Sequence, residues 1–287
     1  MKFCLILLLI TLSSPFVQAK TKVKNEVLLS ENTHPLVEQH AAHFQPLPFP
    51  EHIQISFSTS NSIAPYFFED KPQGVQYELL VAALNLSGIA IQELVHAPNL
   101  RAQRLLNTKK VDCMINTPDN VEGMFYTQSL IEYQNSVFSL TKNHLKINEI
   151  QDLKTISILG FQNARQYLGD EFKAIATENA NYSEISNQKS QVVMLFNGYV
   201  ESIVLERRIF EYYRYQLRHK LNTALAVTEV ALFAPAERKI ACHNQQTAAI
   251  VDQAITVLKQ SYQYQEILSL AEQHNYQPNQ QFNQLTR

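Results

Sequence analysis

Few residues in this chain have the types and spacing that catalysis or metal binding requires. His40 and His43 lie one turn apart if their segment is helical, which could hold a metal ion, but an exposed histidine pair is the alternative because no cysteine or carboxylate cluster lies nearby. Glu122 and Glu206 could serve as general acid or base, yet neither stands in a tight motif. The sequence has no Ser/His/Asp or Cys/His arrangement. It therefore predicts a protein that is not an enzyme and that has no metal or cofactor.

The N-terminus predicts export from the cytoplasm. Lys2, the apolar run 3–12 and the small-residue end at Ala19 are typical of a secretory signal peptide that is cleaved after Ala19. The apolar run has about half the length that a membrane span needs, and a retained interfacial anchor is the alternative. We expect a periplasmic protein.

Cleavage at this site leaves two cysteines, Cys113 and Cys242. In an oxidising compartment they could form a disulfide, and the alternative is two buried free thiols. Their positions are far from the spacing of a redox or metal motif.

Composition gives the class of protein but not its function. The 287 residues suit two modest domains or one large domain, and the hydrophobic content of 45% with 17% charged residues is ordinary for a globular protein. The net charge of −2 argues against a general nucleic-acid binder, which needs a basic surface.

The stretch 111–140 organises the rest of the chain. It has a short apolar run at 111–115, the polar pair Asn116 and Thr117, a turn at 118–120, and extended aromatic-rich segments at 125–126 and 133–140. This order of strand, turn and long extended segment is expected where a sheet meets a cleft and the backbone continues into another lobe.

The remaining pattern alternates strands with helices, which favours an α/β fold with parallel strands. In the first half we expect strands at 53–57, 89–91 and 111–115 and helices at 75–86 and 101–106. In the second half we expect strands at 155–159 and 202–205, helices at 164–168, 189–196, 210–213, 247–258 and 264–273, and extended chain at 221–235. The sequence thus predicts two α/β lobes joined by two extended crossings.

Several segments, in this order, resemble motifs of the extracytoplasmic solute-binding proteins of family 3, the polar amino acid type. They are Ala64-Pro65-Tyr66-Phe67-Phe68 with Asp70 and Gly74, Arg101-Ala102 with Leu105, Leu106 and Asp112, Tyr126 to Leu130, Ile150 to Gly160, and Asn197 to Arg207. The resemblance covers 52–275 and implies a two-lobe, type II periplasmic-binding-protein-like fold. It implies one lobe at 52–138 with 232–275 and a second at 139–231, after an irregular leader at 20–51 and before a loosely ordered tail at 276–287.

The resemblance also places a ligand cleft at the loop 58–66, the turns 116–120 and 160–164, and Glu206. Tyr66 and Phe67 would offer a ring face, or else pack within the lobe, and Asn116 and Thr117 would hydrogen-bond the ligand, or else only form the turn. Gly160, Gln162 and Asn163 begin a helix whose free amides attract an anion. Glu206 stands where the family commonly has an acid that holds an ammonium group; the alternative is a surface ion pair with Arg207 or Arg208.

The sequence departs from the family at Asn120. Amino acid binders of the family have an arginine three residues after the threonine, and its guanidinium grips the ligand carboxylate. A buried carboxylate without its cation costs about 2–5 kcal/mol. A standard α-amino acid is therefore disfavoured unless Arg101 or Arg165 takes this part, and Arg101 is the better placed of the two.

The resemblance implies a periplasmic solute-binding protein of the ABC-transporter kind that closes on a small polar solute, for amino acid transport or for sensing. Its partners would be the solute and an inner-membrane transporter or sensor protein, with no nucleic acid and a monomeric state. One alternative is a degenerate member that acts through protein contacts, for which the Tyr/Arg-rich run 207–215 could serve, although this run could equally be an ordinary amphipathic helix face. Another alternative is a dehydratase-like enzyme on the same fold.

Overall fold

The structure is a computed structural model that describes residues 53–59, 63–68, 72–117 and 120–272. The expected signal peptide, the leader with His40 and His43, and the tail at 276–287 lie outside the described residues. All described residues belong to one unit, Pro48–Arg287. Within them, no helix has the length and apolarity to cross a membrane.

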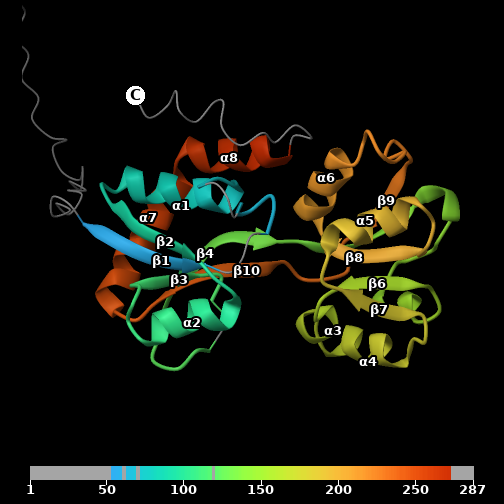
Figure 1. The fold of residues 1–287 in the computed structure, drawn as a ribbon, viewed down its shortest axis with the longest axis horizontal. Helices are drawn as coiled ribbons and strands as arrows, with labels where there is room; N and C mark the ends of the chain where they lie inside the picture. Colours follow the sequence, from blue (N-terminus) through green and yellow to red (C-terminus); the bar gives the residue numbers. More distant parts are fainter. Residues whose placement is uncertain (1–52, 60–62, 69–71, 118–119, 273–287) are drawn as a thin grey trace, which may run out of the picture. The chain divides into compact units, whose positions relative to one another are not determined.

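The described strands form two sheets of five strands each. The first sheet has the order β2-β1-β3-β10-β4, with β1 (Gln54–Thr59) parallel to β2 (Ala90–His96) and β3 (Cys113–Ile115), and with β10 (Ala236–Cys242) antiparallel to β3 and β4 (Phe125–Tyr133). Helices α1 (Val75–Leu86), α7 (Gln245–Gln260) and α8 (Tyr262–Glu272) lie on one side of this sheet and α2 (Asn99–Asn107) on the other (Figure 1). Both faces of the sheet are therefore buried, which explains why β1 is buried at five consecutive positions.

The second sheet has the order β7-β6-β8-β5-β9. Its strands are β5 (Asn135–Leu140), β6 (Ile158–Phe161), β7 (Tyr182–Ile185), β8 (Ser202–Glu206) and β9 (Val227–Val230). Around them lie the helices α3 (Ala164–Tyr167), α4 (Asp170–Glu178), α5 (Gln188–Phe196) and α6 (Arg207–Gln216) and the 3-10 turns Thr141–Asn143 and Ile150–Lys154. Strands β6, β7 and β8 are parallel, so their carboxyl ends meet at one edge of the sheet.

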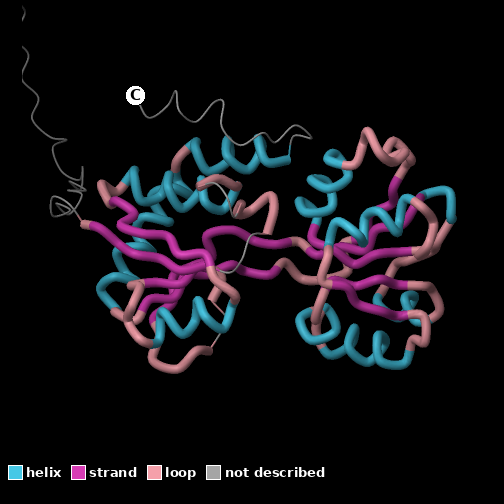
Figure 2. The backbone as a smooth tube through the Cα atoms, viewed as in Figure 1, coloured by secondary structure: helices cyan, strands magenta, loops and turns pink. Residues whose placement is uncertain are grey.

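The chain passes between the two sheets twice, as the sequence predicts. Gln134 alone separates β4 from β5, and residues 231–235 lead from β9 back to β10 (Figure 2). The side-chain amide of Gln134 donates to the carbonyl oxygens of Asn135 at 2.8 Å and of Phe233 at 2.9 Å. One side chain thereby ties the two crossing segments together.

Three elements were not predicted from the sequence: β7, α4 and β10. Strand β10 lies between β3 and β4 although its sequence, AERKIAC, begins with three charged residues in a row after alanine. The structure accommodates them because Lys239 pairs with Glu237 at 2.6 Å and Arg238 lies over an aromatic ring. Strand β6 also begins at Ile158, later than the expected position 155.

Cys113 and Cys242 are bonded to each other. They lie directly opposite in the antiparallel pair of β3 and β10, and neither is exposed. The bond closes a loop between residues 129 positions apart. The disulfide links β3, from the N-terminal part of the first sheet, to β10, which joins this sheet from much later in the chain.

Candidate functional site

Glu206 is the last residue of β8 and caps the start of α6. Its Oε2 accepts the backbone N–H of Ile209 at 3.0 Å, which satisfies one of the free amides at the helix start. Ligands of α/β sheets commonly bind outside the carboxyl ends of parallel strands, where this residue lies. Only 3% of Glu206 is exposed, and its Oε1 has no hydrogen-bond partner among the described residues.

The carboxyl group of Glu206 has a raised pKa. Burial disfavours its charged form, and this effect outweighs the hydrogen bond from Ile209, the hydroxyl of Tyr66 and the positive charge of Arg208. A buried carboxylate with an unused oxygen is costly to keep. Such a group is therefore a candidate for binding a donor that the protein itself does not supply.

Tyr66 supplies the second unsatisfied polar atom. It lies in the turn 63–68, where its N–H donates to the Ile63 carbonyl at 2.7 Å. A Cβ at Gly74 would come within 2.2 Å of the Tyr66 carbonyl oxygen, so glycine is required there for this turn to pack against α1. The Tyr66 hydroxyl is fully buried near both Glu206 and Arg208 without a hydrogen bond of good geometry to either, and burial first, then Glu206, raises its pKa.

The ring of Tyr66 is covered by Tyr133. The two rings are stacked with 3.9 Å between their centroids, and Tyr133 is 5% exposed. The Tyr133 hydroxyl donates to Gln76 Oε1 at 2.8 Å, and Gln76 and Asn116 exchange two amide hydrogen bonds of 2.7 and 3.1 Å. The guanidinium carbon of Arg238 lies 4.4 Å from the Tyr133 ring centroid. Residues from five parts of the chain thus converge at Tyr66, Gln76, Asn116, Tyr133 and Arg238.

Of the other residues predicted to bind a ligand, some are buried within the fold and some are exposed. The Thr117 hydroxyl donates to the Met114 carbonyl at 2.7 Å and is buried. Asn120, where the family motif has arginine, is exposed with φ 62°. Phe67 packs in the core, 2% exposed, with its ring edge-on to His96. Arg101 is exposed on α2.

The turn after Gly160 already holds a carboxylate of the chain itself. The amides of Asn163 and Arg165 donate to Glu184 at 2.7 and 2.9 Å, and the Tyr182 hydroxyl donates to the same carboxylate at 2.7 Å. Helix α3, which follows, has only four residues. Glu184 therefore occupies the Asn163 amide, one of the group at Gly160, Gln162 and Asn163 that was expected to attract a ligand anion.

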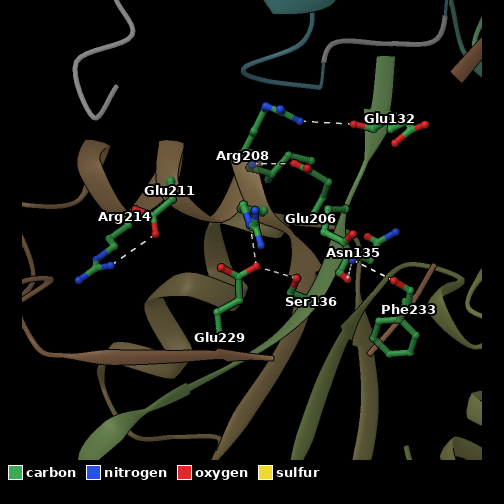
Figure 3. Close-up of polar contacts among 12 residues, drawn as sticks. Glu132, Asn135, Ser136, Glu206, Arg208, Glu211, Arg214, Glu229 and Phe233 are labelled. Carbon is green, nitrogen blue, oxygen red and sulfur yellow. Dashed lines mark hydrogen bonds and ion pairs between the residues drawn. The ribbon is translucent and has the colours of Figure 1, made fainter. Parts of the chain in front are cut away.

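The expected alternative for Glu206, a surface ion pair with one of its neighbours, does not fit its burial. Arg207 instead pairs with Glu229 at 2.7 Å. The positive charge of Arg208 acts on Glu206 and Tyr66, and its Nη1 donates to the Glu132 carbonyl at 3.4 Å (Figure 3). The sequence did not point to Gln76, Tyr133 or Arg238, because the contacts that bring them together join distant parts of the chain.

No protein-family model and no curated protein sequence matches the chain. Solved structures do match. A histidine kinase sensor domain similar to periplasmic binding proteins has a TM-score of 0.57 and 15% identity over 76% of this chain and 96% of its own. The second substrate-binding domain of GlnP from Lactococcus lactis has 0.57 and 16% over 77% and 96%. An ancestral cationic amino acid solute-binding protein has 0.58 and 17% over 75% and 94%. With its two α/β sheets, the chain therefore has the two-lobe periplasmic-binding-protein-like fold.

Proposed function

We propose that the chain is an extracytoplasmic solute-binding protein that binds a small polar solute at Glu206 and Tyr66. One observation carries this proposal: Glu206 Oε1 and the Tyr66 hydroxyl are both buried near one another, and neither has a hydrogen-bond partner among the described residues. A buried polar atom without a partner costs about 1–3 kcal/mol, and a bound solute that supplies the partner would remove that cost.

The chemistry of these atoms favours a cationic group on the solute. A carboxylate only accepts hydrogen bonds, so an ammonium or guanidinium donor fits Glu206, and the phenol can accept as well. Solved structures with this fold include an ancestral cationic amino acid solute-binding protein and an ancestral arginine-binding protein. Asn120, Arg101 and Arg165 are exposed, whereas Arg238 is half-buried on the Tyr133 ring, so Arg238 is the better placed cation for a solute carboxylate in place of the family's arginine.

Binding requires that side chains of the site move. Tyr66, Tyr133 and Glu206 are 0%, 5% and 3% exposed, and the stacked rings fill the place where a solute would lie. A solute shifts the protein toward a binding conformation only by its higher affinity for that conformation. The partner that senses this shift would be an inner-membrane transporter or a sensor protein, and the likeness to a transporter domain and to a kinase sensor domain supports both.

A thermal-shift screen of the purified protein tests the proposal. Amino acids, polyamines, organic acids and sugars are each added at millimolar concentration, and a solute at a hundredfold excess over Kd stabilises by about 2.7 kcal/mol. We expect the largest shift with a solute that has an amino or guanidino group, and we expect Glu206→Gln to remove it. Tyr167→Phe, at a side chain that is 70% exposed, is the matched control and keeps the full shift. Absence of any shift contradicts solute binding.

One observation favours a second candidate, a protein that acts through protein contacts without a solute. The rings of Tyr66 and Tyr133 already stack on each other, and the guanidinium group of Arg238 also lies over the Tyr133 ring, so these ring faces are covered without a solute. A protein of this second kind would show no shift in the same screen, and Glu206→Gln would change its stability without any solute dependence.

A further inference from the structure

A cavity lies where the start of α6 meets elements of the first sheet. Its volume is about 230 Å³, and its lining comes from β4, α7 and α8 and from Arg208 on α6. Arg208 reaches β4, where its Nη1 donates to the Glu132 carbonyl at 3.4 Å (Figure 3). The lining includes neither Glu206 nor Tyr66, and no member of the network around Tyr133. This cavity is therefore a separate place for a small molecule.

Charged side chains of both signs line the cavity. Lys259 on α7 and Glu132 on β4 are exposed, and neither side chain makes a hydrogen bond or an ion pair with another described residue. Arg208 adds a second positive charge. Burial raises the pKa of Tyr264 in the lining, Glu132 raises it further, and Arg208 opposes the rise, so both charges reach this ring. A molecule in the cavity thus meets one carboxylate and two cations.

The rest of the lining is apolar or already hydrogen-bonded. Ile131 is buried, Leu268 is half-buried, and the ring of Tyr264 also faces the cavity. The Ser129 hydroxyl donates to the Ile131 carbonyl at 2.9 Å and accepts the backbone N–H of Arg238 at 3.0 Å. The groups that a ligand would pair with are therefore the charged side chains.

We propose that this cavity binds a small zwitterion, a molecule with a carboxylate, an ammonium group and a short apolar part. An anion alone would lie beside the Glu132 carboxylate, and a cation alone would lie beside Lys259 and Arg208, so each would meet a like charge. A molecule with both charges can turn its carboxylate to Lys259 and its ammonium group to Glu132. Its apolar part then packs against Tyr264. The inference does not rest on the solute site at Glu206.

The size and the opening of the cavity fit such a molecule. A water molecule takes about 30 Å³ of liquid volume, so the cavity has the volume of about eight water molecules. L-Valine has a carboxylate, an ammonium group and an isopropyl group, with about the same number of non-hydrogen atoms. Because Glu132 and Lys259 are exposed, a solute reaches them without displacing a buried side chain. At the Glu206 site, by contrast, stacked rings must move.

Isothermal titration calorimetry with L-valine tests the proposal on the purified protein. We expect saturable binding. Two analogues that each lack one charge, isovalerate without the ammonium group and isobutylamine without the carboxylate, should bind at least about tenfold more weakly, because each loses a charge-assisted hydrogen bond.

Substitutions in the lining assign the binding to the cavity. Lys259→Gln and Glu132→Gln should each weaken the binding of L-valine about tenfold, and both should fold because both side chains are exposed. Lys189→Gln and Glu93→Gln are the matched controls, since they remove the same charges at exposed positions outside the lining and should keep the wild-type Kd. The proposal is overturned if L-valine gives no saturable heat, if either analogue binds equally well, or if Lys259→Gln or Glu132→Gln keeps the wild-type Kd.

Glu206→Gln separates this cavity from the solute site. Binding of L-valine that persists in Glu206→Gln and is weakened in Lys259→Gln supports the cavity. Binding that is lost in Glu206→Gln and kept in Lys259→Gln overturns the cavity and supports the solute site. Binding of L-valine through Lys259, in a protein whose shift in the solute screen does not depend on Glu206, keeps the cavity and rejects the solute site.

Discussion

The ring of Tyr133 lies on the ring of Tyr66, 3.9 Å away and tilted by 23°. Tyr66 belongs to a turn near the start of the first sheet, and Tyr133 is the last residue of β4, immediately before the chain crosses to the second sheet. The stack therefore joins the proposed solute site to the segment that connects the two sheets. A solute that binds the face of the Tyr66 ring covered by Tyr133 would displace a residue beside that crossing.

Removing the Tyr133 hydroxyl should weaken this arrangement modestly. In Tyr133→Phe the hydrogen bond to Gln76 is lost, but Gln76 Oε1 still accepts from Asn116, so we expect a loss of about 1 kcal/mol in the free energy of unfolding. Tyr133→Ala also leaves a cavity and should cost about 3–5 kcal/mol. Urea unfolding measures both, with Tyr167→Phe as an exposed control. Equal stability of Tyr133→Phe and the wild type would show that the network does not hold the ring.

Glu206→Gln should stabilise the protein at neutral pH. Burial raises the pKa of Glu206 above its ordinary value of 4.5, so the folded state binds more protons than the unfolded state between that value and the raised pKa. The wild type thus loses unfolding free energy as pH rises through this window, at about 1.4 kcal/mol for each unit of pKa difference. Glutamine still accepts from Ile209 and does not ionise. The gain in Tm should be small at pH 4 and larger at pH 7; a loss at pH 7 would mean that Arg208 fully compensates the burial.

Glu184→Gln should change the stability in the opposite direction and destabilise the protein at neutral pH. Burial raises the pKa of Glu184, but the hydrogen bonds from the Arg165 amide, the Tyr182 hydroxyl and the Asn163 amide outweigh it and hold the pKa below 4.5. The stability that this carboxylate contributes is present above pH 4.5 and is lost as pH falls through the lowered pKa. We expect Glu184→Gln to cost about 1 kcal/mol at pH 7 and less in acid, measured by urea unfolding at several pH values. A pH-independent difference would contradict this account.

Reduction of the Cys113–Cys242 bond should destabilise the protein strongly. The bond closes a loop between residues 129 positions apart, for which loop-closure entropy gives about 4–5 kcal/mol. Urea unfolding with and without dithiothreitol measures the loss. The double variant Cys113→Ala, Cys242→Ala is the control, because its stability should not respond to the reductant. If dithiothreitol does not lower the stability of the wild type either, the Cys113–Cys242 bond is not formed in solution.

The fold could be predicted from the sequence where local pattern and burial agree. The alternation at Ile53, Ile55 and Phe57 indicates a strand, and the repeated order of strands and helices indicates two α/β lobes. Strand β10 could not be predicted in this way. Lys239 and Glu237 pair with each other within the strand, Arg238 lies over the Tyr133 ring, and only Ile240, Ala241 and Cys242 of the strand are fully buried.

The site could be predicted only in part. Tyr66 and Glu206 stand at motif positions, and the structure brings both to one buried place. Tyr133 could not be assigned from the sequence, because its position on Tyr66 comes from contacts across the fold and not from local spacing. At Asn163 the sequence predicted backbone amides that would attract an anion. In the structure the amides of Asn163 and Arg165 donate to Glu184 on the neighbouring strand β7, which the sequence did not predict.

Gln134 gives a test of the connection between the two sheets. Its amide donates to the carbonyls of Asn135 and Phe233, one in each crossing segment. Gln134→Glu keeps the shape but replaces the donor by a carboxylate that faces two carbonyl oxygens. This carboxyl group should have a raised pKa, so the variant should lose stability as pH rises through that pKa, with a cost at pH 7 of about 1–3 kcal/mol. Gln134→Ala, which removes the donor without adding charge, should cost less and show no added pH dependence. Equal stability of the two variants at pH 7 would mean that the side chain turns to solvent and that the two crossing segments are held together by other contacts.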